Sequence, residues 1–106
     1  MDYKGAYEDL IEAYKLNPKD KNVLNNLAMV CDEVGRADET LVYLNRIIEL
    51  DSTYIAAYVN IGFKYQLMGN HEKAIKYFVK AIELDPESAL AYSNISYSLL
   101  QIGKLD

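Results

Sequence analysis

A fixed spacing between recurring residues constrains the fold of this chain more than any other feature of its sequence. The tripeptide Glu-Leu-Asp occurs at 49–51 and again at 83–85. Two sets of residues keep the same spacing, namely Gly35, Gly69 and Gly103, and Asn26, Asn60 and Asn94. A period of about 34 residues is typical of repeat architectures, in which each supersecondary unit stacks on the next.

The sequence pattern within each repeat predicts two helices. In 55–68 and in 71–84 apolar residues recur at steps of three and four, which is the period of an amphipathic helix. Gly69 lies between them and is a turn signal, because glycine reaches the left-handed conformation that ends a helix at little steric cost. Pro86 ends the second segment, because proline disfavours helical geometry in the residue before it. The repeating unit is therefore a helical hairpin.

A helical hairpin that repeats with this period resembles the tetratricopeptide repeat family. The middle repeat carries the spaced residues of that family: Tyr58, Ile61, Gly62, Tyr65, Ala74, Phe78 and Pro86. The two departures are conservative, since Tyr58 and Ile61 stand where the family usually has Trp and Leu. The resemblance covers essentially the whole chain. It implies an all-α fold, a right-handed α-α superhelix of six antiparallel helices.

The phase of the repeat divides a single domain, 1–106, into two full repeats with a half repeat at each end. The half repeats are 1–20 and 89–106, and the full repeats are 21–54 and 55–88. We call the first helix of a repeat A and the second B, which gives the order B-A-B-A-B-A. The expected helices are 2–16, 21–34, 37–50, 55–68, 71–84 and 89–102. Residues 103–106 match the turn between an A and a B helix.

The first full repeat departs from the pattern at two small positions. Thr40 stands where the second repeat has Ala74, and Ile47 stands where it has Ala81. Small residues at these positions let neighbouring helices approach closely in the family. The larger side chains predict either slightly wider local packing or compensation by a small neighbour such as Ala28.

The resemblance also implies a peptide-binding groove on the concave face, which the A helices line in this family. The candidate groove residues are Asn22, Asn25, Asn26, Met29, Val59, Asn60, Phe63, Gln66, Leu90, Ser93, Asn94 and Tyr97. Two subsets are prominent, an asparagine ladder and an apolar set.

The asparagine ladder consists of Asn26, Asn60 and Asn94. A primary amide offers both a donor and an acceptor, so a row of amides can satisfy the backbone of an extended peptide without reading its side chains. The alternative is that these amides hydrogen-bond a neighbouring helix.

The apolar set consists of Met29, Phe63 and Tyr97, at one position in each A helix, together with Val59, Leu67 and Leu90. Methionine and aromatic side chains suit adaptable peptide recognition. The alternative is that part of the wider set is core, and Leu67 is the residue we most expect there.

Co-chaperone members of the family hold a C-terminal carboxylate in a clamp of lysine, asparagine and arginine. The matching positions here are Asn25, Met29, Asn60, Leu90 and Asn94, and none is cationic. A carboxylate needs cationic or multiple N–H donors to offset its desolvation. We therefore expect no carboxylate clamp.

Composition excludes several classes of partner. The formal net charge is −5 and the isoelectric point about 4.8, so the chain has no basic stripe for nucleic acid or anionic membrane surfaces. Any charged partner is expected to be basic. No apolar run approaches the roughly 18 residues of a membrane span, and the N-terminus is not a signal peptide. A single cysteine, Cys31, fits a reducing compartment, so we expect a cytoplasmic protein.

No residues point to catalysis. His71 is expected to be an exposed turn residue and Cys31 a small buried hydrophobe. The sequence has no Gly-rich phosphate loop, no metal-ligand cluster and no nucleophile elbow, so we expect no enzyme activity, cofactor or metal. Seven tyrosines fall at positions where we expect packing rather than a functional role: Tyr7, Tyr14, Tyr43, Tyr58, Tyr65, Tyr77 and Tyr92.

The leading hypothesis is a protein–protein interaction scaffold that binds a peptide of its partner in the groove. One alternative is a structural or regulatory segment of a longer multidomain protein. Another is a self-associating array, a homo-oligomer joined through the terminal helices 2–16 and 89–102. The second of these segments carries an apolar stripe that includes Ile95, Leu99 and Ile102, and solenoid ends otherwise need polar caps.

Overall fold

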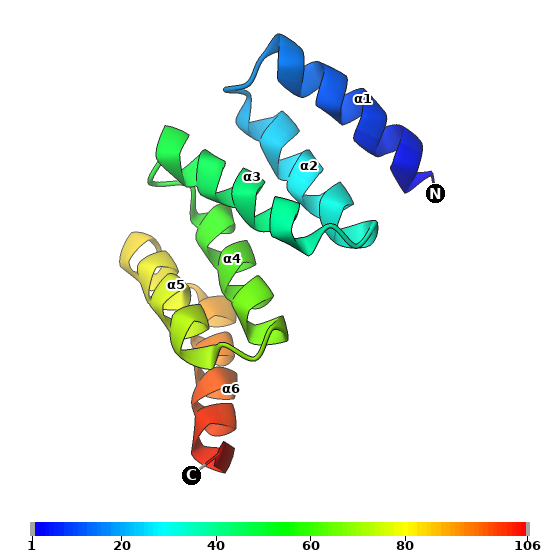
Figure 1. Ribbon diagram of the computed structural model, residues 1–106. Helices are drawn as coiled ribbons and strands as arrows, with labels where there is room; N and C mark the ends of the chain where they lie inside the picture. The colour runs from blue at the N-terminus through cyan, green and yellow to red at the C-terminus, as the bar shows by residue number, and fades with distance from the viewer. Residues whose placement is uncertain (1, 106) are drawn as a thin grey trace. The chain divides into compact units, whose positions relative to one another are not determined.

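The computed structural model describes residues 2–105, and at Leu105 it describes the backbone alone. Every regular element in that range is an α-helix, which confirms the all-α prediction for the described part of the chain (Figure 1). The helices are α1 (Tyr3–Leu16), α2 (Lys21–Glu33), α3 (Ala37–Leu50), α4 (Ile55–Leu67), α5 (His71–Leu84) and α6 (Ala89–Leu105).

Glycine turns end α2 and α4 as the sequence predicts. Gly35 and Gly69 both have a φ of +80°, a left-handed conformation. The N–H of Arg36 donates to the carbonyl of Cys31 (2.7 Å), and the N–H of Asn70 donates to that of Tyr65 (2.9 Å). These bonds satisfy carbonyls that the helix end leaves without partners.

The turn expected at 103–106 is wrong for the described residues, because α6 continues through Gly103 to Leu105. Gly103 does not take a positive φ. Glycine permits the left-handed conformation without requiring it. At Gly35 and Gly69 a B helix then packs back on the A helix, and no described segment does this after Gly103. Asp106 lies outside the described residues.

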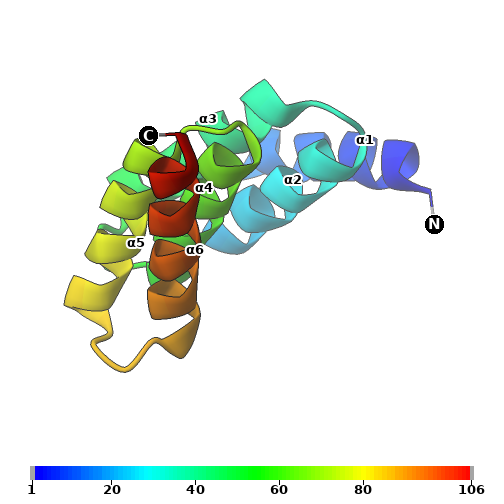
Figure 2. The same ribbon diagram turned by 90° about the horizontal axis from the view of Figure 1, so that it is seen from below.

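The chain divides between Ser52 and Thr53 into two compact units, which we describe separately. In the first unit α2 packs against both α1 and α3. In the second unit α5 packs against both α4 and α6 (Figure 2). Each unit therefore contains one complete A–B hairpin and one additional helix.

Short polar side chains begin four of the helices. Each accepts a hydrogen bond from a backbone N–H of the first turn, which would otherwise lack a partner. These capping residues are Asp2 for α1, Asp20 for α2, Asn70 for α5 and Ser88 for α6.

The core of the first hairpin accommodates Thr40 through the small residue Ala28. Both side chains are buried. The Thr40 hydroxyl donates to the carbonyl of Ala28, 3.2 Å away, so its burial leaves no polar atom unsatisfied. Of the two alternatives from the sequence, this geometry supports compensation by a small neighbour.

Helix α1 covers the first hairpin through aromatic and polar contacts. Tyr14 meets Tyr43 of α3 edge to face, with ring centroids 5.7 Å apart. The Tyr7 hydroxyl donates to Glu39 (3.1 Å), and the Arg36 guanidinium lies 4.8 Å from the centre of the Tyr7 ring. Burial raises the pKa of Tyr43 to about 12, so this ring stays neutral at physiological pH.

Close approach of α4 and α5 in the second hairpin depends on Gly62. A Cβ atom at Gly62 would lie 2.7 Å from Cε1 of Phe78, closer than carbon atoms pack. Phe78 is fully buried, and Phe63 meets its ring edge to face at 5.8 Å. The absence of a side chain at Gly62 therefore provides the space for the Phe78 ring.

The packing role expected of the tyrosines holds for Tyr58, which is buried, but is wrong for Tyr92, which is 50% exposed. Both stand at the same position of an A helix, one repeat apart. The physical difference is that no helix of the described chain follows α6 to cover Tyr92.

Candidate functional site

Helix α2 presents the first group of candidate groove residues. Asn22, Asn26 and Met29 are exposed and follow a helical spacing that places them on one face. The Met29 side chain is 58% exposed. Asn25 is half-buried, and its Oδ1 atom is buried with no hydrogen-bond partner among the described residues.

Helix α4 supplies the second group, and its members differ in exposure. Asn60 and Phe63 are half-buried, so each retains some surface. Val59 is only 8% exposed, so it lies in the interior and offers a ligand little surface.

Gln66 joins α4 to α6. Its amide nitrogen donates to the backbone carbonyl of Asn94 and to the hydroxyl of Ser98, each at 2.9 Å. These bonds use both N–H groups of Gln66, so its amide nitrogen fixes the spacing of the two helices. Asn94 in turn donates from Nδ2 to the carbonyl of Leu90 in its own helix, 2.8 Å away. The second N–H and the oxygen of the Asn94 side-chain amide take no part in this bond.

Helix α6 presents the third group. Leu90, Ser93 and Tyr97 are exposed, and the Tyr97 ring is 51% exposed. The Tyr97 ring meets the His71 imidazole edge to face at 6.0 Å. The structure thus brings the α4 and α6 groups together within the second unit, whereas the α2 group belongs to the first.

The expectation that His71 is an exposed turn residue is wrong. It is the first residue of α5, is half-buried, and its Nδ1 lies 3.1 Å from the Ser98 hydroxyl oxygen. Ser98 is fully buried, so its hydroxyl cannot meet a substrate. The pair joins α5 to α6. The sequence gives no sign of it, because the partners of Ser98 come from two other helices.

The expectation that Leu67 belongs to the core is also wrong, since its side chain is 79% exposed. Leu67 is the last residue of α4, where the chain turns towards α5. The sequence holds a signal for this exposure. The same position is occupied by Glu33 one repeat earlier and by Gln101 one repeat later.

Cys31 is buried as expected. Desolvation by the surrounding core raises the pKa of its thiol to about 11, so the unreactive thiol form predominates at neutral pH.

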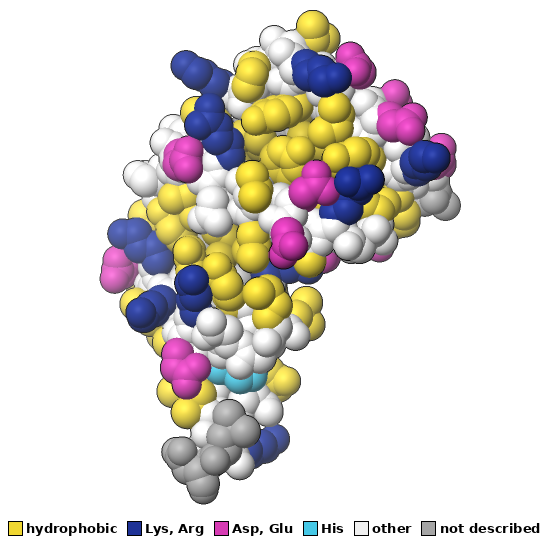
Figure 3. Space-filling model, in the orientation of Figure 1, with side chains coloured by type: hydrophobic (Ala, Val, Ile, Leu, Met, Phe, Trp, Pro, Cys, Tyr) yellow, Lys and Arg dark blue, Asp and Glu magenta, His cyan; other side chains and the backbone are white. Residues whose placement is uncertain are grey.

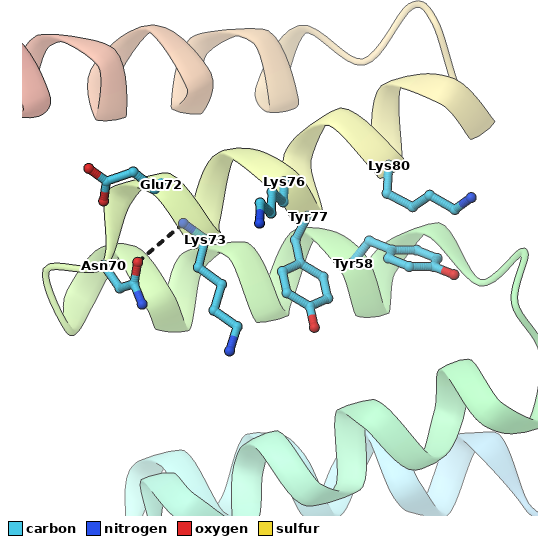
Figure 4. A pocket seen from close by; sticks show the side chains of 7 residues that line it. All are labelled: Tyr58, Asn70, Glu72, Lys73, Lys76, Tyr77 and Lys80. Carbon is cyan, nitrogen blue, oxygen red and sulfur yellow. Dashed lines mark hydrogen bonds between the residues drawn. The ribbon is translucent and has the colours of Figure 1, made fainter.

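A hollow of about 640 Å³ lies on the second unit, lined by α4, α5 and the turn between them (Figure 4). Its lining residues are Tyr58, Asn70, Glu72, Lys73, Lys76, Tyr77 and Lys80. Three lysines and one glutamate give the lining a formal charge of +2, although the whole chain carries −5. This local excess of positive charge suits an anionic group.

Tyr65 organises one end of this hollow. Its ring stacks on Tyr77, with centroids 5.7 Å apart, and the Lys73 ammonium lies 4.8 Å from the centre of the Tyr65 ring. The corresponding residue of the first repeat is Cys31, and Lys73 corresponds to Glu39. In the first hairpin the residues that match the lining include two basic and two acidic side chains, so the excess of positive charge is a property of the second hairpin.

Two kinds of feature are absent from the described residues. No helix in that part of the chain is long and apolar enough to cross a membrane. No group of three or more His, Cys, Asp or Glu side chains there is arranged to hold a metal ion.

Comparison with known sequences identifies one repeat directly. Residues 55–88 match the model of the tetratricopeptide repeat (TPR) family. A TPR repeat-containing protein of Methanocaldococcus jannaschii is 38% identical over 48 residues, which cover 45% of this chain and 8% of that protein. U-box domain-containing protein 70 of Oryza sativa subsp. japonica is 36% identical over 70 residues, covering 66% of this chain and 9% of that protein. The chain thus spans less than a tenth of either relative.

Solved structures share the fold. A crystal structure of MamA protein has a TM-score of 0.88 and 27% identity, covering 95% of this chain and 55% of that one. YrrB, described as a TPR protein with an unusual peptide-binding site, has a TM-score of 0.79 and 31% identity, with coverage of 86% and 47%. The first TPR of Spaghetti (RPAP3), solved with an HSP90 peptide, has a TM-score of 0.86 at 18% identity, with coverage of 95% and 80%.

These likenesses confirm the α-α superhelix class predicted from the repeat. With the repeat register and the helical hairpins, the family match shows that residues 55–88 are a tetratricopeptide repeat, and together these findings support a tetratricopeptide repeat protein.

Proposed function

We propose that the chain is a protein–protein interaction scaffold that binds a peptide segment of a partner in the groove along its A helices. The observation that carries the proposal is a repeated pair on each A helix. An asparagine is followed three residues later by a methionine or an aromatic residue. The pairs are Asn26 with Met29, Asn60 with Phe63, and Asn94 with Tyr97.

The two members of each pair have complementary chemistry. Residues three apart lie on the same face of a helix, so each amide adjoins an apolar side chain. The amide can bond the backbone of an extended peptide, while the apolar side chain can pack against a side chain of that peptide. Asn94 can do this despite its bond to Leu90, because one N–H and its oxygen remain.

Local contacts hold two of the three apolar members in place. Phe63 rests edge to face on the buried Phe78 ring, and Tyr97 rests on His71. An anchored side chain loses less conformational freedom when a ligand binds. The groove positions still contain no lysine or arginine, so we propose a peptide bound through its backbone and apolar side chains rather than through a carboxylate.

The likeness to YrrB supports peptide binding for this chain, since that protein is described as having a peptide-binding site and is 31% identical. The proposal concerns this chain alone, because it spans less than a tenth of its two sequence relatives.

The test uses fluorescence anisotropy with peptides selected from an array by the wild-type chain. We expect Asn60→Ala and Tyr97→Ala each to weaken binding about three- to tenfold, because each removes a hydrogen bond or an exposed apolar contact. Val79→Ala is the matched control, since Val79 is exposed on the B helix α5 and is not a groove residue. Binding that is unchanged in both groove variants would contradict the proposal.

A further inference from the structure

The hollow on α4 and α5, which we call the basic hollow, carries charge of the opposite sign to the chain as a whole. The lining has a formal charge of +2, whereas the net charge of the chain is −5. Basic side chains gather over α5, beside hydrophobic side chains, on the face shown in Figure 3. The volume of about 640 Å³ lies within the range of ligand sites in proteins, roughly 300–1,000 Å³.

Three lysines form a row along the basic hollow. Lys73, Lys76 and Lys80 follow steps of three and four residues, which keeps them on one face of α5. With a rise of about 1.5 Å per residue, the row extends about 10 Å along the helix axis. The cationic groups are therefore spread along the hollow, whereas a single phosphate would need them to converge on one point.

The ammonium groups of this row are available to a ligand. All three lysine side chains are exposed. Only Lys80 forms a salt bridge within the described part of the chain, to Glu83 at 3.5 Å. That pair is exposed on both sides, and exposed pairs are weak, so a carboxylate of a ligand can replace Glu83. Lys73 lies over the Tyr65 ring, and this contact leaves its ammonium group without a carboxylate partner.

The N-terminal end of α5 contributes little to anion binding. The Asn70 side chain accepts a hydrogen bond from the N–H of Lys73 (3.2 Å), so the chain itself caps this end of the helix. Glu72 adds a negative charge in the first turn. Its carboxylate points away from Lys76 and Tyr77 in Figure 4. The lysine side chains are therefore the groups that attract an anionic ligand.

The matching surface of the first hairpin pairs its own basic residues. Arg36 forms a salt bridge with Glu39 at 3.1 Å. Arg46 forms one with Glu49, also at 3.1 Å. Val42 stands at the position of the middle lysine. Because the first hairpin folds without a row of lysines, the packing of the repeat does not account for the row in the second.

We propose that the basic hollow binds an acidic, extended segment of a partner protein. Successive side chains of an extended chain point to opposite faces, so every second residue, at a spacing of about 7 Å, lies on one face. Carboxylates at alternate positions then reach different ammonium groups of the row, and the flexible lysine stems take up the remaining difference in spacing. The half-buried Tyr77 ring offers apolar surface to the aliphatic part of a glutamate side chain.

The charge of the remaining surface also favours this site. The rest of the chain is more acidic than the whole, so it repels an acidic segment from other parts of the surface. The site is independent of the peptide-binding proposal, because no lining residue of the basic hollow belongs to the candidate groove.

The experiment is fluorescence anisotropy of the full chain with a labelled peptide of alternating Glu and Ala residues, which places every carboxylate of an extended chain on one face. A peptide of alternating Gln and Ala residues has a similar shape without the charge, and we expect it to bind about tenfold more weakly. Affinity for the Glu–Ala peptide should fall as the NaCl concentration rises, since salt screens exposed charges.

Substitutions in the lysine row locate the binding. We expect Lys76→Gln to weaken binding of the Glu–Ala peptide about two- to fivefold. The double variant Lys73→Glu with Lys76→Val introduces the residues of the first hairpin, makes the charge of the lining negative, and should reduce binding to the level of the Gln–Ala peptide. Lys15→Gln removes an exposed lysine of α1 and is the matched control, which should bind as wild type does. Circular dichroism checks that each variant remains folded.

The outcomes separate this proposal from the groove proposal. The groove variant Asn60→Ala should bind the Glu–Ala peptide as wild type does, and a loss confined to that variant would overturn the proposal. Equal binding of the Glu–Ala and Gln–Ala peptides would also overturn it, as would a Lys15→Gln variant that weakens binding as much as Lys76→Gln. Displacement of the peptide by an equal concentration of inorganic phosphate would indicate a general anion site and would contradict the assignment to an acidic segment.

Discussion

The α2–α3 hairpin and the α4–α5 hairpin are successive copies of the same repeat, and they place different side chains at matching core positions. The first has Ala28 and Leu44, both buried, where the second has Gly62 and Phe78. The larger residue of α5 is accommodated by the loss of a Cβ atom from α4. The hairpin geometry therefore constrains the combined volume of the pair more than the identity of either residue.

The two hairpins also differ at Thr40 and Cys31, and in each case neighbouring residues accommodate the change. Thr40 stands where the second hairpin has Ala74, and it satisfies its hydroxyl by bonding to Ala28. Cys31 stands where the second hairpin has Tyr65, which supports Lys73 and Tyr77 beside the basic hollow. Cys31 is thus buried at this position of the first hairpin, whereas the second hairpin carries the basic hollow.

The largest expected effect comes from Phe78→Ala, which leaves a ring-sized cavity beside Gly62. We expect the free energy of unfolding to fall by about 3–5 kcal/mol, with Leu44→Ala at the same position of the first hairpin costing about 2–4 kcal/mol. Urea unfolding followed by circular dichroism measures both. If Phe78→Ala cost under about 1 kcal/mol, the comparison of the two cores would be wrong.

Gly62→Ala should cost about 1–3 kcal/mol, because its Cβ would collide with the Phe78 ring. Adding Phe78→Leu creates the Ala–Leu pair of the first hairpin and should recover much of that loss. A double-mutant cycle from urea unfolding measures the coupling. Gly103→Ala is the control, since a Cβ there meets no atom within 4 Å and should stabilise α6 slightly. Additive effects of the two core changes would refute the shared-volume account.

A pH dependence should distinguish Cys31 from the rest of the first hairpin. Its folded pKa of about 11 lies above the usual 9.0, so the stabilisation is complete below pH 9 and is lost as the pH rises towards 11. At pH 10.5 we expect the wild type to lose about 2 kcal/mol more than Cys31→Val, while Tyr43, whose pKa is also raised, contributes to the loss in both proteins. Equal losses in both proteins between pH 8 and pH 10.5 would show that the thiol does not carry the effect.

Thr40→Val keeps the side-chain shape and removes the hydrogen bond to the Ala28 carbonyl. We expect a loss of about 1 kcal/mol in thermal or urea unfolding. Thr40→Ser keeps the hydroxyl and serves as the companion variant, since it loses only a methyl group. A Thr40→Val variant as stable as the wild type would show that this hydrogen bond makes no net contribution to the free energy of unfolding.

The smallest effect is a gain. Asn25 has a buried amide oxygen without a partner among the described residues, and the second hairpin has Val59 at that position. Asn25→Val introduces the residue of the second hairpin and should raise the free energy of unfolding by about 0.5–1 kcal/mol. Asn22→Val, at an exposed site of the same helix, should change stability by less. A loss of stability in Asn25→Val would indicate that the amide has a structural role.

The sequence predicted the helices well, because their limits depend on local signals. Glycine turns at Gly35 and Gly69 and the helical periodicity placed both ends of α3 and α5 correctly. Features that depend on neighbouring helices were harder to predict. The exposure of Tyr92 depends on what covers α6, and the contact of His71 with Ser98 joins residues 27 apart.

The candidate groove was predicted from the family resemblance and the register of the repeat, and the structure adds differences in burial and bonding among its residues. Val59 is interior, and Gln66 links α4 to α6. Register assigns a position to each residue, but it does not reveal the bonds that a side chain makes after folding. The pairing of an asparagine with an apolar residue three positions later is the feature on which the binding proposal rests.

The most direct test of the binding proposal is an NMR titration of the ¹⁵N-labelled chain with an array-selected peptide. The account predicts that the largest chemical-shift changes fall on α4 and α6 at Asn60, Phe63, Asn94 and Tyr97, with further changes on α2 near Asn26. Changes concentrated instead on α5, at the lysines of the basic hollow, would contradict it.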